Sequence, residues 1–145
     1  MKTPTMSVCV AALLVLVGHA QRSSSTAIVL SPPSALAWKA GTTGVEQVAL
    51  WGDRDHGANG TMSRYPAGFE LKPHYHTNEM RGIILSGTWI LGVVGAEIAR
   101  LPAGSYFSLP GQTAHTDRCA GPDPCVLFIT QDDRRDTVFL DAPIH

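Results

Sequence analysis

The chain has 145 residues, of which 44% are hydrophobic and 16% charged, and its formal net charge is −1. A chain of this length can bury one core and has no room for a second, so a single folded domain is expected. The sequence contains no basic cluster that could neutralise a line of phosphates, which argues against a nucleic-acid partner.

The N-terminal segment differs in composition from the rest. Lys2 is followed by the apolar run VCVAALLVLVG, and the small residues Gly18 and Ala20 precede a polar break. This pattern is typical of a secretory signal peptide and predicts residues 1–20 as the cleaved segment. A membrane anchor is the alternative, but the run is about eleven residues and a bilayer span needs roughly twenty. We therefore expect a periplasmic or secreted protein with no membrane attachment after cleavage.

The remainder of the chain divides into a short leader and a long β-rich region. Residues 21–26 are small and polar and predict a disordered leader, which leaves 27–145 as the folded domain. The strands expected in chain order are 27–30, 35–40, 45–51, 61–65, 69–76, 80–86, 88–94, 97–101, 105–109, 113–117, 125–131 and 137–140. No window outside the signal segment carries a helical stripe without Gly or Pro. The sequence therefore predicts an all-β domain, either a sandwich or a jelly-roll barrel.

Two connections between these strands are predicted in more detail. Gly87, between residues 80–86 and 88–94, and Gly104, before residues 105–109, stand where tight hairpin turns need a residue free to take positive φ. Each is expected to join two strands that pair as a hairpin.

Two histidines on residues 69–76 suggest a metal site. His74 and His76 differ by two positions, so on a strand both imidazoles project to the same face. That spacing lets a sheet present two nitrogen ligands to one metal ion, although the same spacing also occurs on solvated faces. His115 follows a Pro-Gly turn in a second segment, GSYFSLPGQTAHTD, and is the third candidate ligand.

The two histidine segments resemble the two motifs of the cupin superfamily, G-x5-H-x-H-x3-E-x6-G and G-x5-P-x-G-x2-H-x3-N. The residues in register with these motifs are Gly68, His74, His76 and Gly87 for the first, and Gly104, Pro110 and His115 for the second. The resemblance, to small single-domain bacterial cupins, extends from about Trp51 to Ile129. It implies an RmlC-like jelly-roll β-barrel (double-stranded β-helix) with a divalent Fe, Mn, Zn or Ni ion, a small-molecule ligand in the barrel, and a homodimer.

The acid position of the first motif departs from the pattern. In register it falls on Met80, while Glu79 stands one residue earlier and would face the other side of a regular strand. An inward Glu79 would also bring Arg81 inward, which is costly unless the guanidinium is paired. Strand alternation therefore favours Met80 inside, and Glu79 is a possible fourth ligand only if a turn or bulge near Thr77 rotates it inward.

The two cysteines of the mature region flank the turn-prone segment AGPDP. In an oxidising compartment Cys119 and Cys125 are expected to form a disulfide, which would stabilise the fold by roughly 2 kcal/mol. Two free thiols that never meet are one alternative. A zinc-binding pair is another, but no second cysteine pair accompanies them.

Three functions fit this sequence. The first is an exported metal-dependent enzyme, for which the resemblance implies dioxygenase-like chemistry or, less commonly in the family, isomerisation. The second is a non-catalytic module that binds or senses a small molecule or metal through a degenerate site. The third is a structural barrel whose site has decayed. The fold by itself does not choose among them, because one fold hosts many functions.

Overall fold

The computed structural model describes residues 27–41, 43–93 and 98–141, and the fold considered below is that of residues 31–141. The predicted signal segment 1–20 and leader 21–26 lie outside the described residues. Where the chain is described, no helix is long and apolar enough to cross a membrane. The elements are η1 (Pro33–Ala35), β1 (Lys39–Ala40), β2 (Glu46–Gly52), β3 (Asn59–Tyr65), β4 (Glu70–Tyr75), β5 (Met80–Ser86), β6 (Thr88–Val93), β7 (Ala99–Pro102), β8 (Tyr106–Leu109), β9 (His115–Ala120), β10 (Cys125–Gln131) and β11 (Val138–Phe139).

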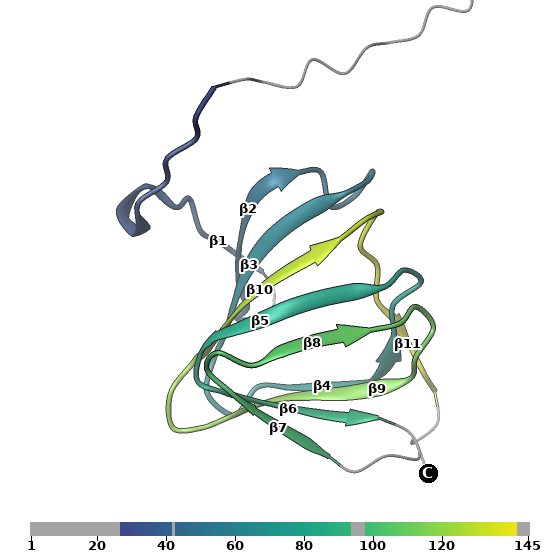
Figure 1. The fold of residues 1–145 in the computed structure, drawn as a ribbon. Coiled ribbons are helices and arrows are strands. Elements are labelled where there is room, and N and C mark those ends of the chain that lie inside the picture. Colours follow the sequence, from purple (N-terminus) through teal and green to yellow (C-terminus); the bar gives the residue numbers. More distant parts are fainter. Residues whose placement is uncertain (1–26, 42, 94–97, 142–145) are drawn as a thin grey trace, which may run out of the picture. The chain divides into compact units, whose positions relative to one another are not determined.

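The strands form two antiparallel sheets that face each other (Figure 1). The six-stranded sheet has the order β1-β2-β3-β10-β5-β8, and the five-stranded sheet has the order β11-β4-β9-β6-β7. From β3 to β6 and again from β7 to β11, each strand lies in the opposite sheet from the one before it. Two facing antiparallel sheets whose connections switch sheet form a jelly roll, so the predicted all-β jelly-roll fold is confirmed.

The two glycine turns are placed correctly by the sequence, but the strand partners are not. Gly87 and Gly104 have φ values of 76° and 87°, as the turns require. However, β5 pairs with β10 and β8, whereas β6 pairs with β7 and β9, so the strands on either side of Gly87 lie in different sheets. The strands on either side of Gly104, β7 and β8, also lie in different sheets. Both predicted hairpins are therefore wrong, because a local turn signal does not decide which distant strand supplies the hydrogen bonds.

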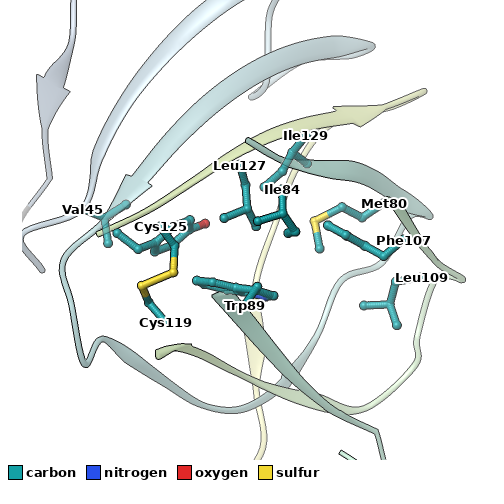
Figure 2. Packing of buried hydrophobic residues seen from close by; sticks show 11 residues of the cluster. Val45, Met80, Ile84, Trp89, Phe107, Leu109, Cys119, Cys125, Leu127 and Ile129 are labelled. Carbon is teal, nitrogen blue, oxygen red and sulfur yellow. A yellow bond between two sulfur atoms is a disulfide. The ribbon is translucent and has the colours of Figure 1, made fainter. Parts of the chain in front are cut away.

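The space between the sheets is filled by apolar side chains that alternate along the strands. On β10 every second residue from Cys125 to Gln131 is buried, which is the period of a strand with one face inward. Figure 2 shows Ile84 and Leu127 from one sheet packed toward Trp89 from the other, with the disulfide at one end of the cluster and Met80 and Phe107 at the other. This packing is the core on which the site described below is built.

The predicted disulfide is confirmed. Cys119 and Cys125 are bonded and fully buried, with a sequence separation of six residues. The bond ties the end of β9 in one sheet to the start of β10 in the other. It therefore cross-links the two layers at the end of the core away from Met80 (Figure 2).

Candidate metal centre

The three candidate histidines come from β4 and β9, which are neighbours in the five-stranded sheet. His74 lies on β4 directly opposite His115, the first residue of β9, and His76 follows the end of β4. The exposed fractions of His74, His76 and His115 are 0%, 5% and 0%. All three imidazoles are therefore removed from solvent on the inner face of this sheet.

The three rings converge. Their ligand nitrogens all lie within 4.8 Å of one another, the geometry of a group that could hold a metal ion. The ring centroids are 4.2 Å apart for His74 and His115, 5.0 Å for His74 and His76, and 5.2 Å for His76 and His115. The distant third histidine of the sequence pattern is thus brought beside the other two by the pairing of β4 with β9.

Backbone carbonyls fix which nitrogen of each ring faces the centre. The Nδ1 atoms of the three rings donate to carbonyl oxygens: His74 to Lys72 at 2.8 Å, His115 to Thr113 at 2.7 Å, and His76 to Asp136 at 2.5 Å. A carbonyl oxygen only accepts, so each Nδ1 carries a proton and each Nε2 of a neutral ring has a free lone pair. This is the arrangement by which proteins orient histidine ligands toward a metal.

The Nε2 atoms of the histidines indicate whether a metal ion suits the site. The Nε2 atoms of His74 and His115 are buried and have no hydrogen-bond partner. A buried polar atom without a partner costs about 1–3 kcal/mol, so the fold retains these two atoms at a cost. A divalent transition metal would satisfy both lone pairs, and imidazole ligands suit Zn, Fe and Ni. The donor set therefore fits the metal that the motif implies.

Burial and nearby charges set the protonation of the rings. The pKa of His76 is lowered to about 4, mainly by burial; the hydrogen bond to the Asp136 carbonyl opposes this shift, and the positive charge of Arg135 adds to it. Burial likewise holds the pKa of His74 below its usual value. For His115, burial also acts to lower the pKa, but the Asp117 carboxylate outweighs it and the pKa is raised. Near neutral pH, His74 and His76 are therefore in the neutral form that binds metals.

A buried carboxylate, which the sequence analysis missed, lies beside the histidines. Asp117 is two residues after His115 on β9, so both face inward, and its exposed fraction is 7%. Its Oδ2 atom is 3.6 Å from the Nε2 atoms of both His74 and His115. Its Oδ1 atom accepts a hydrogen bond of 3.0 Å from the indole Nε1 of Trp89. The available signal was the His-x-Asp alternation on β9, which places an acid on the ligand face.

The side chain of Glu79 points away from the three histidines, toward Arg81 and Ser108. Its carboxylate accepts hydrogen bonds from Arg81 Nη2 and from Ser108 Oγ, each at 2.6 Å. Hydrogen bonds from Ser108 and Arg81 hold the pKa of Glu79 below its usual value. The structure therefore does not bring Glu79 to the three histidines. The physical reason is strand alternation: Met80, Gly82 and Ile84 are the buried residues of β5, so the positions of opposite parity, Arg81 and the preceding Glu79, face outward.

Met80 takes the inward position and lines a small cavity next to the histidines. The cavity volume is about 40 Å³, and its lining includes His76, Asp117 and Arg135. Most of the remaining wall is apolar and includes Met80 and Trp89. The structure thus provides a narrow, mostly apolar space with a few polar groups beside the histidines, smaller than a usual small-molecule pocket.

A jelly roll whose β4 and β9 bring three histidines together on the inner face is the arrangement that defines a cupin. The family model of the ChrR cupin-like domain matches residues 15–133 of the chain, and the protein belongs to this family. No curated protein matches the chain.

Solved structures share the fold. An RmlC-like cupin from Shewanella frigidimarina is 21% identical with a TM-score of 0.63, covering 76% of this chain and 95% of its own. KdgF from Halomonas is 20% identical with a TM-score of 0.61, covering 74% of this chain and 96% of its own. The polyketide cyclase RemF from Streptomyces resistomycificus is 13% identical with a TM-score of 0.66, covering 80% of this chain and 87% of its own. At these identities the likeness establishes the fold alone.

Proposed function

We propose that this protein is a metal-dependent cupin that binds a small molecule in its barrel and acts on it there. The observation that carries the proposal is the convergence of three buried histidines whose Nδ1 atoms are all held by backbone carbonyls. The orphaned Nε2 atoms of His74 and His115 are explained if a metal ion accepts their lone pairs.

In this proposal the three histidines hold a divalent Fe, Mn, Zn or Ni ion, and Asp117 supplies the nearby negative charge. Asp117 Oδ2 lies 3.6 Å from two of the histidine nitrogens, so its charge would be close to an ion that these nitrogens hold. Trp89 holds the other carboxylate oxygen and so orients Asp117 toward the rings.

A bound metal would act as a Lewis acid toward a ligand that reaches an open position. The chain's own contribution is to exclude water and to fix the donors. His74 and His115 are fully buried, and Trp89 and Met80 form apolar walls beside them. A dry site of this kind strengthens the interaction between a charged centre and a polar ligand. Dioxygenase-like or isomerase-like turnover is the chemistry that this proposal assigns.

One observation favours a second candidate, a module that binds or senses a metal or small molecule without turnover. The inner cavity of about 40 Å³ leaves little room for a substrate beside His76. A site that admits only water or a very small ligand would hold a metal without converting anything larger.

The proposal includes export to the periplasm or outside the cell, and assembly as a homodimer. The N-terminal signal pattern supports export, and the bonded pair Cys119–Cys125 is consistent with an oxidising compartment. Apolar side chains exposed on the outer face of β5 and β8, namely Ile83, Leu85 and Tyr106, support an interface there. Light scattering of the mature protein would test the dimer.

Metal analysis of the purified mature protein tests the central proposal. The protein is loaded separately with Zn²⁺, Mn²⁺, Fe²⁺ or Ni²⁺, dialysed, and analysed for bound metal. We expect one ion per chain in the wild type and loss of that ion in His115→Gln and His76→Gln, because each variant removes a ligand nitrogen. His56→Gln is the matched control, since His56 is exposed and bonds only Asp53 among the described residues.

The same preparation separates the two candidate functions. Turnover of added small molecules, or consumption of oxygen by the loaded protein but not by His115→Gln, would favour the enzyme. Stoichiometric metal without any turnover would favour the binding module. Failure of every metal to bind, with the protein folded by circular dichroism, would overturn the proposed metal site.

A further inference from the structure

Arg135, which follows β10, has a buried guanidinium nitrogen without a partner. Its Nη1 atom is shielded from solvent and makes no hydrogen bond. Among the described arginines, Arg54, Arg64, Arg81 and Arg118 each lie in an ion pair with a carboxylate. Arg100, Arg134 and Arg135 have no such pair, but Arg100 and Arg134 are exposed to solvent, whereas Arg135 is partly buried. Arg135 as a whole is partly buried, but a buried polar atom without a partner is costly, so Nη1 marks a place where a partner is missing.

The acids nearest to Arg135 in sequence are occupied by other groups. Asp136 accepts hydrogen bonds from the backbone and hydroxyl of Thr77, Asp133 accepts one of 2.7 Å from the backbone N–H of Arg134, and Asp132 pairs with Arg81 at 2.8 Å. The backbone N–H of Arg135 donates to the Arg54 carbonyl at 2.7 Å, which fixes the chain at this point. The guanidinium is therefore placed by a backbone contact and receives no carboxylate from its own loop.

Arg135 lies at the boundary between two spaces. It lines the inner cavity that contains His76 and Asp117, and it also lines an outer recess of about 230 Å³ that contains Arg54. Tyr65, Leu71 and Thr137 share this boundary position, since they too line both spaces. A ligand in the recess would thus meet Arg135 before it reached the histidines.

The charges around this boundary favour an anion. Arg54 also lines the recess, and burial and then the charge of Arg135 lower the pKa of Arg54, so the two guanidinium groups repel each other. The charge of Arg54 is partly neutralised by Asp55 at 3.8 Å, and Arg54 also donates a hydrogen bond to the amide oxygen of Gln47. On the inner side, Asp117 offsets only one of the two charges of a divalent ion. The space between Arg135 and the histidines is therefore electropositive once a metal is bound.

The recess also has an apolar wall. Val45 and Phe69 line it together with Tyr65 and Leu71, and Tyr65 packs against Phe69 with ring centroids 5.1 Å apart. The inner cavity of about 40 Å³ is too small for the body of an organic ligand, whereas the recess is several times larger. A ligand that fits both spaces has a small polar end directed inward and an apolar body left in the recess.

We propose that Arg135 binds the carboxylate of a small organic acid whose apolar body lies against Val45 and Phe69 and whose carboxylate end faces the three histidines. The planar guanidinium forms two parallel hydrogen bonds with a carboxylate, which satisfies its unpartnered nitrogen. This inference rests on the proposed function, because it names the class of ligand for the same site.

Calorimetric titration with a matched pair of probes tests the inference. Benzoate carries a carboxylate on an apolar ring, and benzamide has nearly the same shape without the charge. We expect the metal-loaded wild type to bind benzoate at least about 10-fold more tightly than benzamide, since a charged hydrogen bond contributes more than a neutral one. Arg135→Gln should remove this preference, and Arg135→Lys should keep only part of it, because a lysine does not form the paired contact.

Arg81→Gln is the control variant, because Arg81 is satisfied by Glu79 and Asp132 outside the barrel. Benzoate affinity in this variant should equal that of the wild type. Thermal denaturation gives a second readout: Arg135→Gln without ligand should be at least as stable as the wild type, and benzoate should raise the melting temperature of the wild type and of Arg81→Gln but not of Arg135→Gln. Equal affinity of the wild type for the two probes, or tighter binding of inorganic phosphate than of benzoate, would overturn the inference.

The two proposals fail separately in this experiment. Metal bound at the histidines together with benzoate binding that is unchanged in Arg135→Gln would reject the carboxylate site and leave the metal site standing. Benzoate binding that depends on Arg135, in a protein that takes up no metal, would reject the metal site and leave the carboxylate site standing.

Discussion

Glu79 and Asp117 are two carboxylates close in sequence to the histidine segments, and they have opposite environments. Glu79 immediately precedes β5, on the outer face of the six-stranded sheet, and is partly exposed in a network with Arg81 and Ser108. Asp117 lies on the inner face of the five-stranded sheet, is 7% exposed, and contacts two histidines and Trp89. The acid that the motif suggests is thus on the solvent side, and an acid from another strand is beside the site.

The comparison of Glu79 with Asp117 shows how the surroundings of a carboxylate change the strength of its electrostatic interactions. On the outer face, the carboxylate is partly exposed to solvent and paired with Arg81, and such exposed pairs contribute about 0–1 kcal/mol. On the inner face, the carboxylate is held in a low-dielectric space where its charge acts strongly on the adjacent rings. Changes on the inner face should therefore have large effects on metal binding, and changes on the outer face should have small ones.

The largest expected effect is on the pH dependence of stability of the metal-free protein. The pKa of His76 is about 4 in the folded state and about 6.5 when the chain is unfolded. The unfolded state therefore takes up the proton first, and stability present above pH 6.5 is lost as the pH falls toward 4. The loss is about 3 kcal/mol, partly offset by His115, whose pKa moves in the opposite direction.

Urea denaturation of the metal-free wild type and of His76→Gln between pH 7 and pH 4 measures this loss. The slope should be shallower in the variant, because glutamine does not titrate. A wild-type stability that stays constant over this range would show that the inner face is far more solvated than the burial of the rings indicates.

The next effect compares the two acids directly. Asp117→Asn keeps the shape and the acceptor for Trp89 but removes the negative charge, and we expect metal affinity to fall by roughly 10–100-fold. Glu79→Gln should change metal affinity by less than about 2-fold, because its partners Arg81 and Ser108 lie on the other side of the sheet. Competition with a chelator measures both values. The reverse order of effects would identify Glu79 as the functional acid.

The smallest effect concerns the orientation of Asp117. Trp89→Phe removes the indole donor from Asp117 Oδ1 while keeping an aromatic ring in the core. We expect roughly a 3- to 10-fold loss of metal affinity, smaller than the loss in Asp117→Asn. The absorption bands of bound Co²⁺ should also shift if the carboxylate is reoriented. No spectral shift and no loss of affinity would show that Trp89 serves only in packing.

Much of the site could be predicted from local alternation. The two-residue spacing of His74 and His76 puts both on one face, and the same rule put Met80 inside and Glu79 outside. The disulfide was predictable because Cys119 and Cys125 flank a turn. Asp117 was missed although the same alternation applied to it, because the search for an acid followed the first motif and not the second histidine strand.

The sequence by itself determined the all-β character, the inward face of each histidine strand and the glycines at the turns, since these depend on neighbours within a few residues. Only the tertiary structure decided that the strands on either side of Gly87 belong to different sheets and that β4 pairs with β9. It also decided that Arg135 lies unpaired between the recess and the histidines. These relations join residues tens of positions apart, and their energies depend on packing and burial that no local pattern encodes.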